Sequence, residues 1–341
     1  MFRSYLKSFQ IGSNYRNSSG TILLLVLWFV LILSVLAISL GREVAVDLAL
    51  TKYAIGSLKA DGLASSGIMF AMNQIRKFSE NNAGSSIDTP YQCPLKDGYF
   101  EIGTFVDDLD ETPGSGQNFR HGFQDEERKI NLNAISTDDL GVLSELISLL
   151  GFREDVAKTA AASIMDWQDQ DVTPADDPAT HCKNRPFDQV EELLLVKGVS
   201  EQLFSKLKNF VTVFPKKGGI LKVNFNTASE VVLSALTRAK TGARTNTGLE
   251  DAHSLTRKII AYRNGPDGQE ATSDDRPLEM EKLGLNAKEQ VIFLSLVQNR
   301  TKTSRYFRVR VKGVDKTSGT SVSVEAVIDG EDLSIVSYRK L

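Results

Sequence analysis

The sequence of 341 residues has few of the residue types on which most catalytic and metal sites depend. It contains only two cysteines and three histidines, and the histidines are scattered at His121, His181 and His253. A nucleophile-elbow motif and a glycine-rich phosphate-binding loop are both missing from it. These absences argue against a catalytic triad, a histidine metal site and a nucleotide site, so we expect a protein that is not an enzyme.

Excess positive charge is also missing. The net charge is −3, and residues 1–20 carry Arg3, Lys7 and Arg16 but no acid, so the rest of the chain is more acidic than the whole. An acidic body disfavours binding to nucleic-acid phosphates. The hydrophobic content of 41% and the charged content of 24% are ordinary for a folded protein.

The two cysteines, Cys93 and Cys182, are compatible with one disulfide bond in an oxidising compartment or with two unpaired thiols. Their spacing does not decide between these states. A bond between them would tie the start of a predicted sheet to a loop of the predicted helical region.

The one long apolar run is TILLLVLWFVLILSVLAISL, from Thr21 to Leu40, with no charged residue between Arg16 and Arg42. As a helix it is about 30 Å long, which matches the hydrocarbon core of a bilayer. Because basic residues precede the run, we expect its amino end to stay in the cytoplasm and the body to be exported. A cleaved secretory signal, with its site near Ala37 to Gly41, is the competing interpretation, but its apolar stretch is usually shorter.

Gly20 stands directly before the apolar run, and the polar, basic leader resembles a prepilin-type signal. Cleavage by a prepilin peptidase would leave Thr21 as the new N-terminus. Pilin-like subunits mostly have Glu at the fifth mature position, where this chain has Leu25. A carboxylate there is costly in lipid unless it is paired, and in filament models it pairs with the amine of a subunit already assembled. A terminal subunit has no such partner and does not need the acid.

Beyond the membrane, Ile68, Met72 and Ile75 keep the spacing of an apolar helix face, which predicts that the helix continues to about residue 83. In the C-terminal part, apolar and polar residues alternate with a period of two around 307–311, 322–328 and 333–338, which predicts an antiparallel meander. Further strands are expected at 98–106 and near 120–124.

The middle of the chain, residues 129–302, has helical patterning and an apparent internal repeat. KINLNAIS at 129–136 parallels KVNFNTAS at 222–229, and each copy precedes a predicted helix cap. Helix–turn–helix patterns follow at 190–210 and 278–296 and resemble helix-hairpin-helix domains. Such hairpins hold DNA phosphates when basic residues surround them. Here acidic and basic residues are nearly balanced, which favours a role in packing.

Several motifs in this order resemble the K-type minor pseudopilin family of type II secretion. They are DEERKINLNA (125–134), DWQDQD (166–171), NRPFDQVEELLLVKGVS (184–200), VNFNTAS (223–229), RYFRVRV (305–311) and the closing strands of 326–339. The resemblance implies an α+β fold with a pilin-like long N-terminal helix packed on a small antiparallel sheet and a large inserted α-helical domain. The expected divisions are a leader (1–20), a transmembrane and pilin helix (21–83), the first part of the sheet (84–128), the insertion (129–302) and the last strands (303–341).

The family implies a mechanical function. With I- and J-type minor pseudopilins and other type II secretion components, the chain would form the tip of a periplasmic pseudopilus, prime its assembly and act in export of folded proteins. It would cross the inner membrane once, with its body in the periplasm. Two alternatives are a membrane-anchored helix-hairpin-helix DNA receptor and a type IV pilus minor pilin.

Two acidic loops are candidate calcium sites, because crowded carboxylates repel one another unless they are hydrated or bound to a hard cation. The first loop contains Asp166, Asp169, Asp171, Asp176 and Asp177, and the second, weaker one contains Asp267, Asp274 and Asp275. Neither loop matches an EF-hand. The family resemblance, which includes calcium in this domain, strengthens the first assignment, and a solvated acidic loop is the alternative for both.

Overall fold

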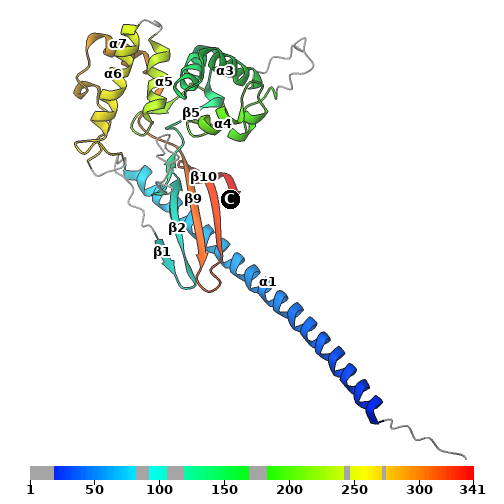
Figure 1. Ribbon diagram of the computed structural model, residues 1–341. Coiled ribbons are helices and arrows are strands. Elements are labelled where there is room, and N and C mark those ends of the chain that lie inside the picture. The colour runs from blue at the N-terminus through cyan, green and yellow to red at the C-terminus, as the bar shows by residue number, and fades with distance from the viewer. Residues whose placement is uncertain (1–18, 82–91, 106–118, 169–182, 242–245, 271–273) are drawn as a thin grey trace, which may run out of the picture. The chain divides into compact units, whose positions relative to one another are not determined.

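The computed structural model describes residues 19–81, 92–105, 119–168, 183–241, 246–270 and 274–341. The chain divides into two compact units, Met1–Gly56 and Ser57–Leu341. The first unit is described only as part of one long helix. The second contains the end of that helix, a sheet and a set of shorter helices (Figure 1).

The elements follow the order helix, strands, helices, strands. The first part consists of α1 (Ser19–Asn81), β1 (Gln92–Leu95), β2 (Gly98–Phe105), β3 (Phe119–His121) and β4 (Gln124–Asp125). The middle part consists of β5 (Ile130–Asn131), η1 (Leu132–Ala134), η2 (Thr137–Asp139), α2 (Leu140–Leu149), α3 (Glu154–Gln168), η3 (Val190–Leu195), α4 (Glu201–Leu207), β6 (Val211–Thr212), β7 (Val223–Asn224), α5 (Glu230–Lys240), α6 (Asn246–Arg263), η4 (Met280–Lys282), α7 (Ala287–Ser295) and β8 (Arg300–Thr301). The last strands are β9 (Tyr306–Asp315), β10 (Ser321–Asp329) and β11 (Ile335–Lys340).

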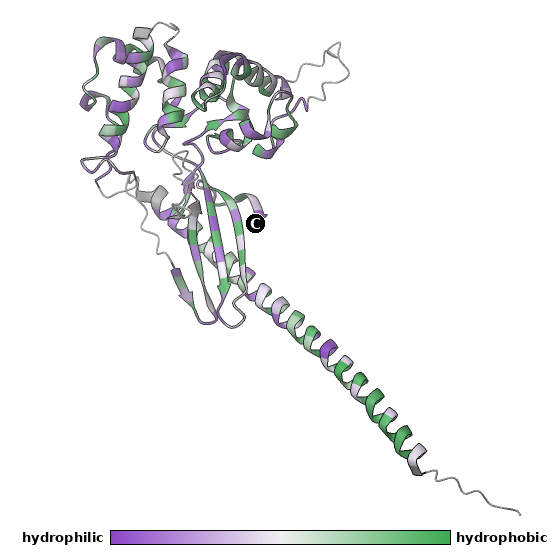
Figure 2. Ribbon diagram, in the orientation of Figure 1, coloured by the Kyte–Doolittle hydropathy of each residue, from purple (hydrophilic) through white to green (hydrophobic). Residues whose placement is uncertain are grey.

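The N-terminal part of α1 is apolar around its whole circumference. Large hydrophobic side chains from Ile22 to Leu40 are each about half exposed or more, and Figure 2 shows this stretch as almost continuously hydrophobic. The helix is long and apolar enough to cross a membrane. An all-round apolar surface is typical of a helix whose solvent is lipid.

The main sheet has the order β1-β2-β9-β10-β11, and all its pairings are antiparallel. Two short strands extend it, β3 next to β2 and β4 next to β9. The predicted meander is confirmed, since β9, β10 and β11 pair in sequence order. β2 comes before the inserted helices in the sequence and β9 comes after them, and these two strands pair directly. The insertion of about 175 residues therefore interrupts the sheet in sequence but not in space.

The C-terminal part of α1 packs on this sheet. Ala64, Ile68, Ala71 and Ile75 repeat every three or four residues and are buried against apolar side chains of β2, β9 and β10. Contact is close because Gly313 of β9 faces the helix: a Cβ on that glycine would collide with the helix backbone at Ala60 and Ala64. The predicted α+β architecture of a long helix on an antiparallel sheet is confirmed.

The inserted helices have their own apolar core, which is larger than the core under α1. α2 contacts both α3 and α5, and α5 contacts α6, so the two halves of the insertion share one core. The first segment of each predicted helix–turn–helix is a 3-10 helix, η3 in one and η4 in the other, and not the α-helix that the sequence suggested. These segments have only six and three residues, and short helical segments of this kind often adopt i→i+3 hydrogen bonding.

The two halves of the insertion make the same backbone and side-chain hydrogen bonds. Asn131 and Asn224 each accept a bond from the backbone two residues later, at 3.0 Å in both copies. Asn133 and Asn226 each accept one from a distant backbone N–H, that of Phe187 at 2.7 Å and that of Leu278 at 2.9 Å. The short parallel pairs β5–β6 and β7–β8 are likewise equivalent. Matching contacts of this kind favour an internal duplication.

Candidate functional site at the junction of sheet and insertion

The chain passes from the sheet into the insertion through five consecutive charged residues, Asp125 to Lys129, which begin with the last residue of β4 and end directly before β5. The backbone of this segment is fixed on both sides. Glu126 N donates to the carbonyl oxygen of Tyr306 in β9 at 2.9 Å, and Asn224 N of β7 donates to Glu127 O at 2.7 Å. The segment therefore connects the sheet with both halves of the insertion.

Glu126 is completely buried, and its carboxylate is shared by three donors. Lys129 Nζ lies 3.0 Å from it, Arg308 Nε 2.6 Å from it, and the hydroxyl of Thr212 donates to it as well. Burial alone would raise the pKa of Glu126, but the charges of Lys129 and Arg308 and their hydrogen bonds lower it well below its ordinary value. The carboxylate is ionised at neutral pH and links β6 of the insertion to β9 of the sheet.

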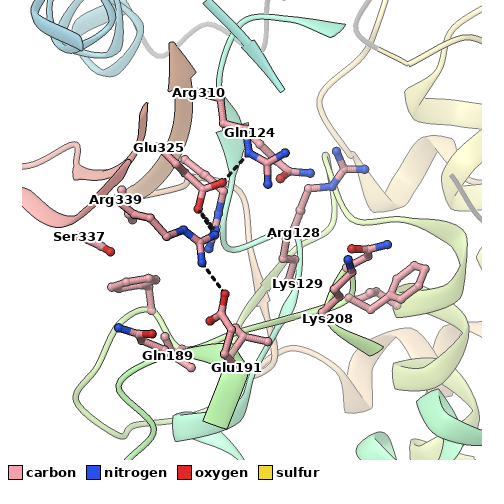
Figure 3. A pocket seen from close by; sticks show the side chains of 18 of the residues that line it. Gln124, Arg128, Lys129, Gln189, Glu191, Lys208, Arg310, Glu325, Ser337 and Arg339 are labelled. Carbon is pink, nitrogen blue, oxygen red and sulfur yellow. Dashed lines mark hydrogen bonds and ion pairs between the residues drawn. The ribbon is translucent and has the colours of Figure 1, made fainter. Parts of the chain in front are cut away.

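A second buried carboxylate, Glu325 of β10, is surrounded by three arginines. Arg308 and Arg339 lie 2.8 Å from Glu325 Oε1, and Arg310 Nε lies 2.5 Å from Oε2. Arg339 also reaches Glu191 of η3 at 2.5 Å (Figure 3). Arg308 joins the two carboxylate centres, since it binds both Glu126 and Glu325. Burial opposes ionisation of Glu325, but the arginines around it hold its pKa below the ordinary value.

Asp125 and Glu127 are in a different environment from Glu126. Asp125 is buried and accepts hydrogen bonds from the side chains of Thr227, Asn224 and Ser304, yet burial raises its pKa. Glu127 accepts bonds from the backbone N–H groups of residues 305 and 306. Burial, together with the charge of Asp125, raises the pKa of Glu127 to about 7.

A cleft of about 710 Å³ opens beside these residues. Its walls come from β9, β10 and β11 of the sheet and from η3, α4 and α5 of the insertion. Six basic residues line it: Arg128, Lys129, Lys208, Arg308, Arg310 and Arg339. Four acidic residues line it: Asp188, Glu191, Glu230 and Glu325.

Chemically, the cleft offers positively charged hydrogen-bond donors and no arrangement of a nucleophile next to a base. In Figure 3, Arg339 stands between Glu191 and Glu325, with Arg128 and Lys208 farther to the right in the cleft. Five of the six basic side chains are paired with carboxylates of the protein itself: Lys129, Arg308, Arg310 and Arg339 with Glu126, Glu191 or Glu325, and Arg128 with Glu270. Within the described ranges no three acidic, histidine or cysteine side chains come together as a metal site.

Comparison with known proteins adds two findings. The family profile described as type II secretion system (T2SS), protein K, matches residues 128–216, the first half of the insertion. A solved structure from enterotoxigenic Escherichia coli, the GspK-GspI-GspJ complex of its type 2 secretion system, has a chain of similar fold, with a TM-score of 0.56 over 88% of this chain and 98% of that chain at 16% sequence identity. Curated proteins give no match.

Together the two findings support a K-type minor pseudopilin. The K-type fold accounts for the element order: a long first helix, an antiparallel sheet and further helices between its strands. The resemblance inferred from the motifs is confirmed in the segment that carries two of them, since DEERKINLNA and NRPFDQVEELLLVKGVS overlap the matched residues.

The predicted leader site lies at the very start of the described chain. Gly20 and Thr21 are in the first turn of α1, and Leu25 follows one turn later with 56% of its side chain exposed. Residues 1–18 lie outside the described ranges. Cleavage between Gly20 and Thr21 therefore stays a prediction.

Most of the first predicted calcium loop lies outside the described residues: Asp166 is at the end of α3, but Asp169, Asp171, Asp176 and Asp177 are not described. The second loop is described except for 271–273. It brings Asp267 and Asp274 together, because Asp267 N donates to Asp274 Oδ2 at 3.3 Å. Asp275 instead lies near the buried Arg263, whose pKa is lowered by burial, an effect that the charges of Glu270 and Asp275 partly oppose. Calcium stays a prediction at both loops.

The predicted disulfide also stays a prediction. Cys93 lies on β1, where it is half-buried against the α1 core, and Cys182 lies outside the described residues.

The ionic junction was not predicted from the sequence. Its two partners lie in motifs that carry the family resemblance, Glu126 in DEERKINLNA and Arg308 in RYFRVRV. The available signal was the alternation of β9, which places Arg308 and Arg310 on one face of the strand opposite the apolar residues. Two arginines on one strand face need carboxylates nearby when that face is covered.

Proposed function

We propose that this protein is the membrane-anchored K-type minor pseudopilin at the tip of a type II secretion pseudopilus and that it has no catalytic activity. The observation that carries the proposal is the match of the protein K profile to residues 128–216 inside a chain with the K-type fold. The related chain was solved in a complex with GspI and GspJ, which supports I- and J-type minor pseudopilins as partners.

The position at the tip is supported by two features of the chain. Leu25 occupies the place of the usual glutamate, so the apolar helix has no carboxylate that needs the amine of a neighbouring subunit. The insertion is larger than the sheet that carries it, and a subunit with neighbours on both sides has little room for such a domain. In this function the tip primes assembly with the other minor pseudopilins and acts in export of folded proteins across the outer membrane.

The anchor is the apolar part of α1, in the inner membrane, with the body in the periplasm. A prepilin peptidase would remove residues 1–20. N-terminal sequencing of the mature protein from membranes tests leader, cleavage and anchoring together, and we expect Thr21 as the first residue. A mature chain that begins after residue 41, or that is recovered free of membrane, would contradict the proposed function.

Assembly is tested separately from processing. We expect the full-length protein, solubilised in detergent, to co-purify with the I- and J-type minor pseudopilins of the same bacterium. If it instead retains duplex DNA at physiological salt, the helix-hairpin-helix DNA receptor is the better description. If its partners are subunits of a type IV pilus, it is a minor pilin of that system.

We further propose calcium binding by the acidic loops. In the second loop Gly265 has a φ of +64°, and a Cβ there would collide with the carboxylate of Asp274, so the close approach of this carboxylate to the turn requires a glycine. Asp267 and Asp274 would bind the ion, with oxygen ligands of the type calcium prefers. A bound ion would neutralise the two carboxylates and hold the loop closed.

The calcium proposal predicts a higher melting temperature in calcium than in a chelator, because a ligand that binds only the folded state stabilises it. Asp267→Asn with Asp274→Asn should reduce the calcium-dependent difference, and Asp251→Asn, in α6 outside the loop, should not. Equal melting temperatures with calcium and chelator would contradict the proposal.

A further inference from the structure

A second pocket lies within the insertion, where its two halves meet. It has a volume of about 460 Å³, and residues of α2, α3, α5 and α6 line it. α2 belongs to the first half and α5 to the second, and these two helices contact each other directly. The volume is in the range of pockets that hold small molecules. This pocket and the cleft beside the ionic junction share no lining residue.

Two opposite charges face the second pocket, Glu145 of α2 and Arg238 of α5. They are at equivalent positions of the internal repeat, because each is the ninth residue after its repeated motif, KINLNAIS in one copy and KVNFNTAS in the other. The residues directly before them, Ser144 and Thr237, are both buried and both carry a hydroxyl group, which supports this alignment. The same position therefore carries an acid in one half of the insertion and a base in the other.

Neither charge has a partner in the part of the chain that the structure describes. The side chains of Glu145 and Arg238 make no hydrogen bond and no ion pair there, with each other or with a third residue. Arg238 Nε is also buried, and a buried donor without an acceptor is uncommon in folded proteins. The other charged residue of the wall, Lys158, is paired with Glu154 at 2.8 Å. An acid and a base thus face the pocket with their hydrogen-bonding capacity unused.

The rest of the wall is mostly aliphatic. Leu140 of α2, Ala161 of α3, Ala239 of α5 and Leu249 of α6 contribute apolar side chains. An apolar wall with a few polar groups is typical of small-molecule sites, because burial of apolar surface supplies affinity and the polar groups fix the orientation of the ligand. The pocket therefore suits a ligand with one anionic, one cationic and one apolar group.

We propose that the second pocket binds a small zwitterion of the α-amino acid class with an aliphatic side chain. The carboxylate of the ligand accepts hydrogen bonds from the guanidinium group of Arg238, and its ammonium group donates to the carboxylate of Glu145. The aliphatic side chain lies against Leu140 and Leu249. A terminus of a polypeptide carries only one of the two charges, which favours a free amino acid. The site is independent of the proposed role in secretion, because it depends only on side chains of the insertion.

The two charges of the ligand decide the selectivity of the site. An analogue that lacks one of them leaves Arg238 or Glu145 covered by the ligand and without a partner, which costs more than the loss of one methyl group from the apolar part. The aliphatic side chain supplies affinity but discriminates less between ligands. Because Glu145 and Arg238 are only partly buried, added salt should weaken the binding.

The test uses the full-length protein in a non-ionic detergent and equilibrium dialysis with radiolabelled leucine. Two competitors lack one charge each: 4-methylpentanoate has no ammonium group, and 3-methylbutylamine has no carboxylate. Glycine keeps both charges and lacks the aliphatic side chain. We expect leucine to bind with a dissociation constant of about 100 μM or tighter, and each competitor to be at least about tenfold less effective than unlabelled leucine.

Two variants of the protein locate the site. Arg238→Met removes the guanidinium group and keeps an extended side chain, and Glu145→Gln removes the negative charge. Each should weaken the binding of leucine at least about tenfold. Arg257→Met on α6 and Glu201→Gln on α4 are the controls, because both residues are exposed and lie outside the pocket, and neither change should affect binding. Melting curves verify that all four variants are folded.

The proposal is overturned if leucine does not bind, or if glycine, 4-methylpentanoate or 3-methylbutylamine competes as well as leucine does. Equal competition by 4-methylpentanoate would show an anion site on Arg238 alone, and equal competition by the amine a cation site on Glu145 alone. It is also overturned if neither Arg238→Met nor Glu145→Gln weakens binding in a folded protein. The competition experiment needs no variant, so it decides the proposal even where a variant fails to fold.

Discussion

At the scale of single residues, the neighbouring glutamates Glu126 and Glu127 have pKa values shifted in opposite directions. The pKa of Glu126 is lowered by Lys129 and Arg308 against the effect of burial, whereas burial and the charge of Asp125 raise the pKa of Glu127 to about 7. Both carboxyls are in the segment that joins sheet and insertion. What differs is whether a basic side chain reaches the carboxylate, which depends on the direction each side chain takes from the backbone.

We predict that Glu127→Gln stabilises the protein more at pH 8 than at pH 5. The pKa of Glu127 is raised on folding, so its favourable contribution is complete below the ordinary pKa of glutamate and is lost as the pH rises to about 7. Glutamine cannot ionise and avoids this loss, which is on the order of 2 kcal/mol. Melting temperatures at the two pH values measure it.

Ionisation of Glu126 does not contribute to the difference in stability between pH 5 and pH 8. Its pKa is lowered on folding, so its contribution is present above the ordinary pKa and is lost only in acid. Glu201→Gln, at an exposed position in the first turn of α4, is the control. If the melting temperatures of Glu127→Gln and wild type differ by the same amount at pH 5 and at pH 8, Glu127 is not protonated in the folded protein.

The duplicated asparagines allow a second prediction. Asn133 is buried and makes three hydrogen bonds, two to Phe187 and one to Val213, so Asn133→Ala leaves several buried backbone groups unpaired. We expect a loss of about 2–4 kcal/mol in urea unfolding. The equivalent Asn226 makes two bonds and is less buried, so Asn226→Ala should cost about 1 kcal/mol. A larger loss of stability for Asn226→Ala than for Asn133→Ala would contradict the explanation by burial.

At the scale of elements, the contact between α1 and the sheet depends on small residues at the crossing point. Gly313→Ala should destabilise the protein by about 1–3 kcal/mol, because the added methyl group collides with backbone atoms of Ala60 and Ala64, which cannot move independently. Gly62→Ala is the matched control. Gly62 is on the exposed face of the same helix with open space around it, so alanine should stabilise by about 0.5–1 kcal/mol. Chemical unfolding of both variants measures the difference.

Elements with strong periodicity were predictable from the sequence. The alternation in β9 and β10 and the apolar stripe of α1 follow local rules, and the three C-terminal strands were expected within a few residues of their observed bounds. The short 3-10 segments η3 and η4 were expected as α-helices. Their type is decided by packing on the core of the insertion, since three to six residues carry too little periodicity to distinguish the two helices.

At the scale of the whole molecule, two hydrophobic cores are connected by one ionic network. One core lies under α1 and the other inside the insertion. Arg308 binds carboxylates on both sides, Glu126 at the entry to the insertion and Glu325 on β10. The charges join the insertion to the sheet beside an apolar contact, in which Val327 of β10 is part of the core of the insertion and Tyr306 of β9 packs against that core.

Arg308→Met should therefore weaken the coupling of the two cores as well as the stability. Removing the guanidinium leaves Glu126 with Lys129 as its only basic partner found in the described residues, and loss of one member of a buried ion pair costs about 3–5 kcal/mol. We expect calorimetry to show two transitions where wild type shows one. Arg153→Met, in an exposed pair with Asp155, is the control and should leave a single transition.

The sequence by itself determined that the start of α1 is long and apolar enough to cross a membrane, and it determined the strands of the sheet, the helical nature of the insertion and the family resemblance. These depend on composition and on periods of two to four residues, which can be read within a short window. Only the tertiary structure decided the pairing of Glu126 with Arg308, 182 residues apart, the opposite pKa shifts of Glu126 and Glu127, and the pocket that Glu145 and Arg238 share. Burial and charge pairing at such separations exist only once the chain is folded, so no local pattern encodes them.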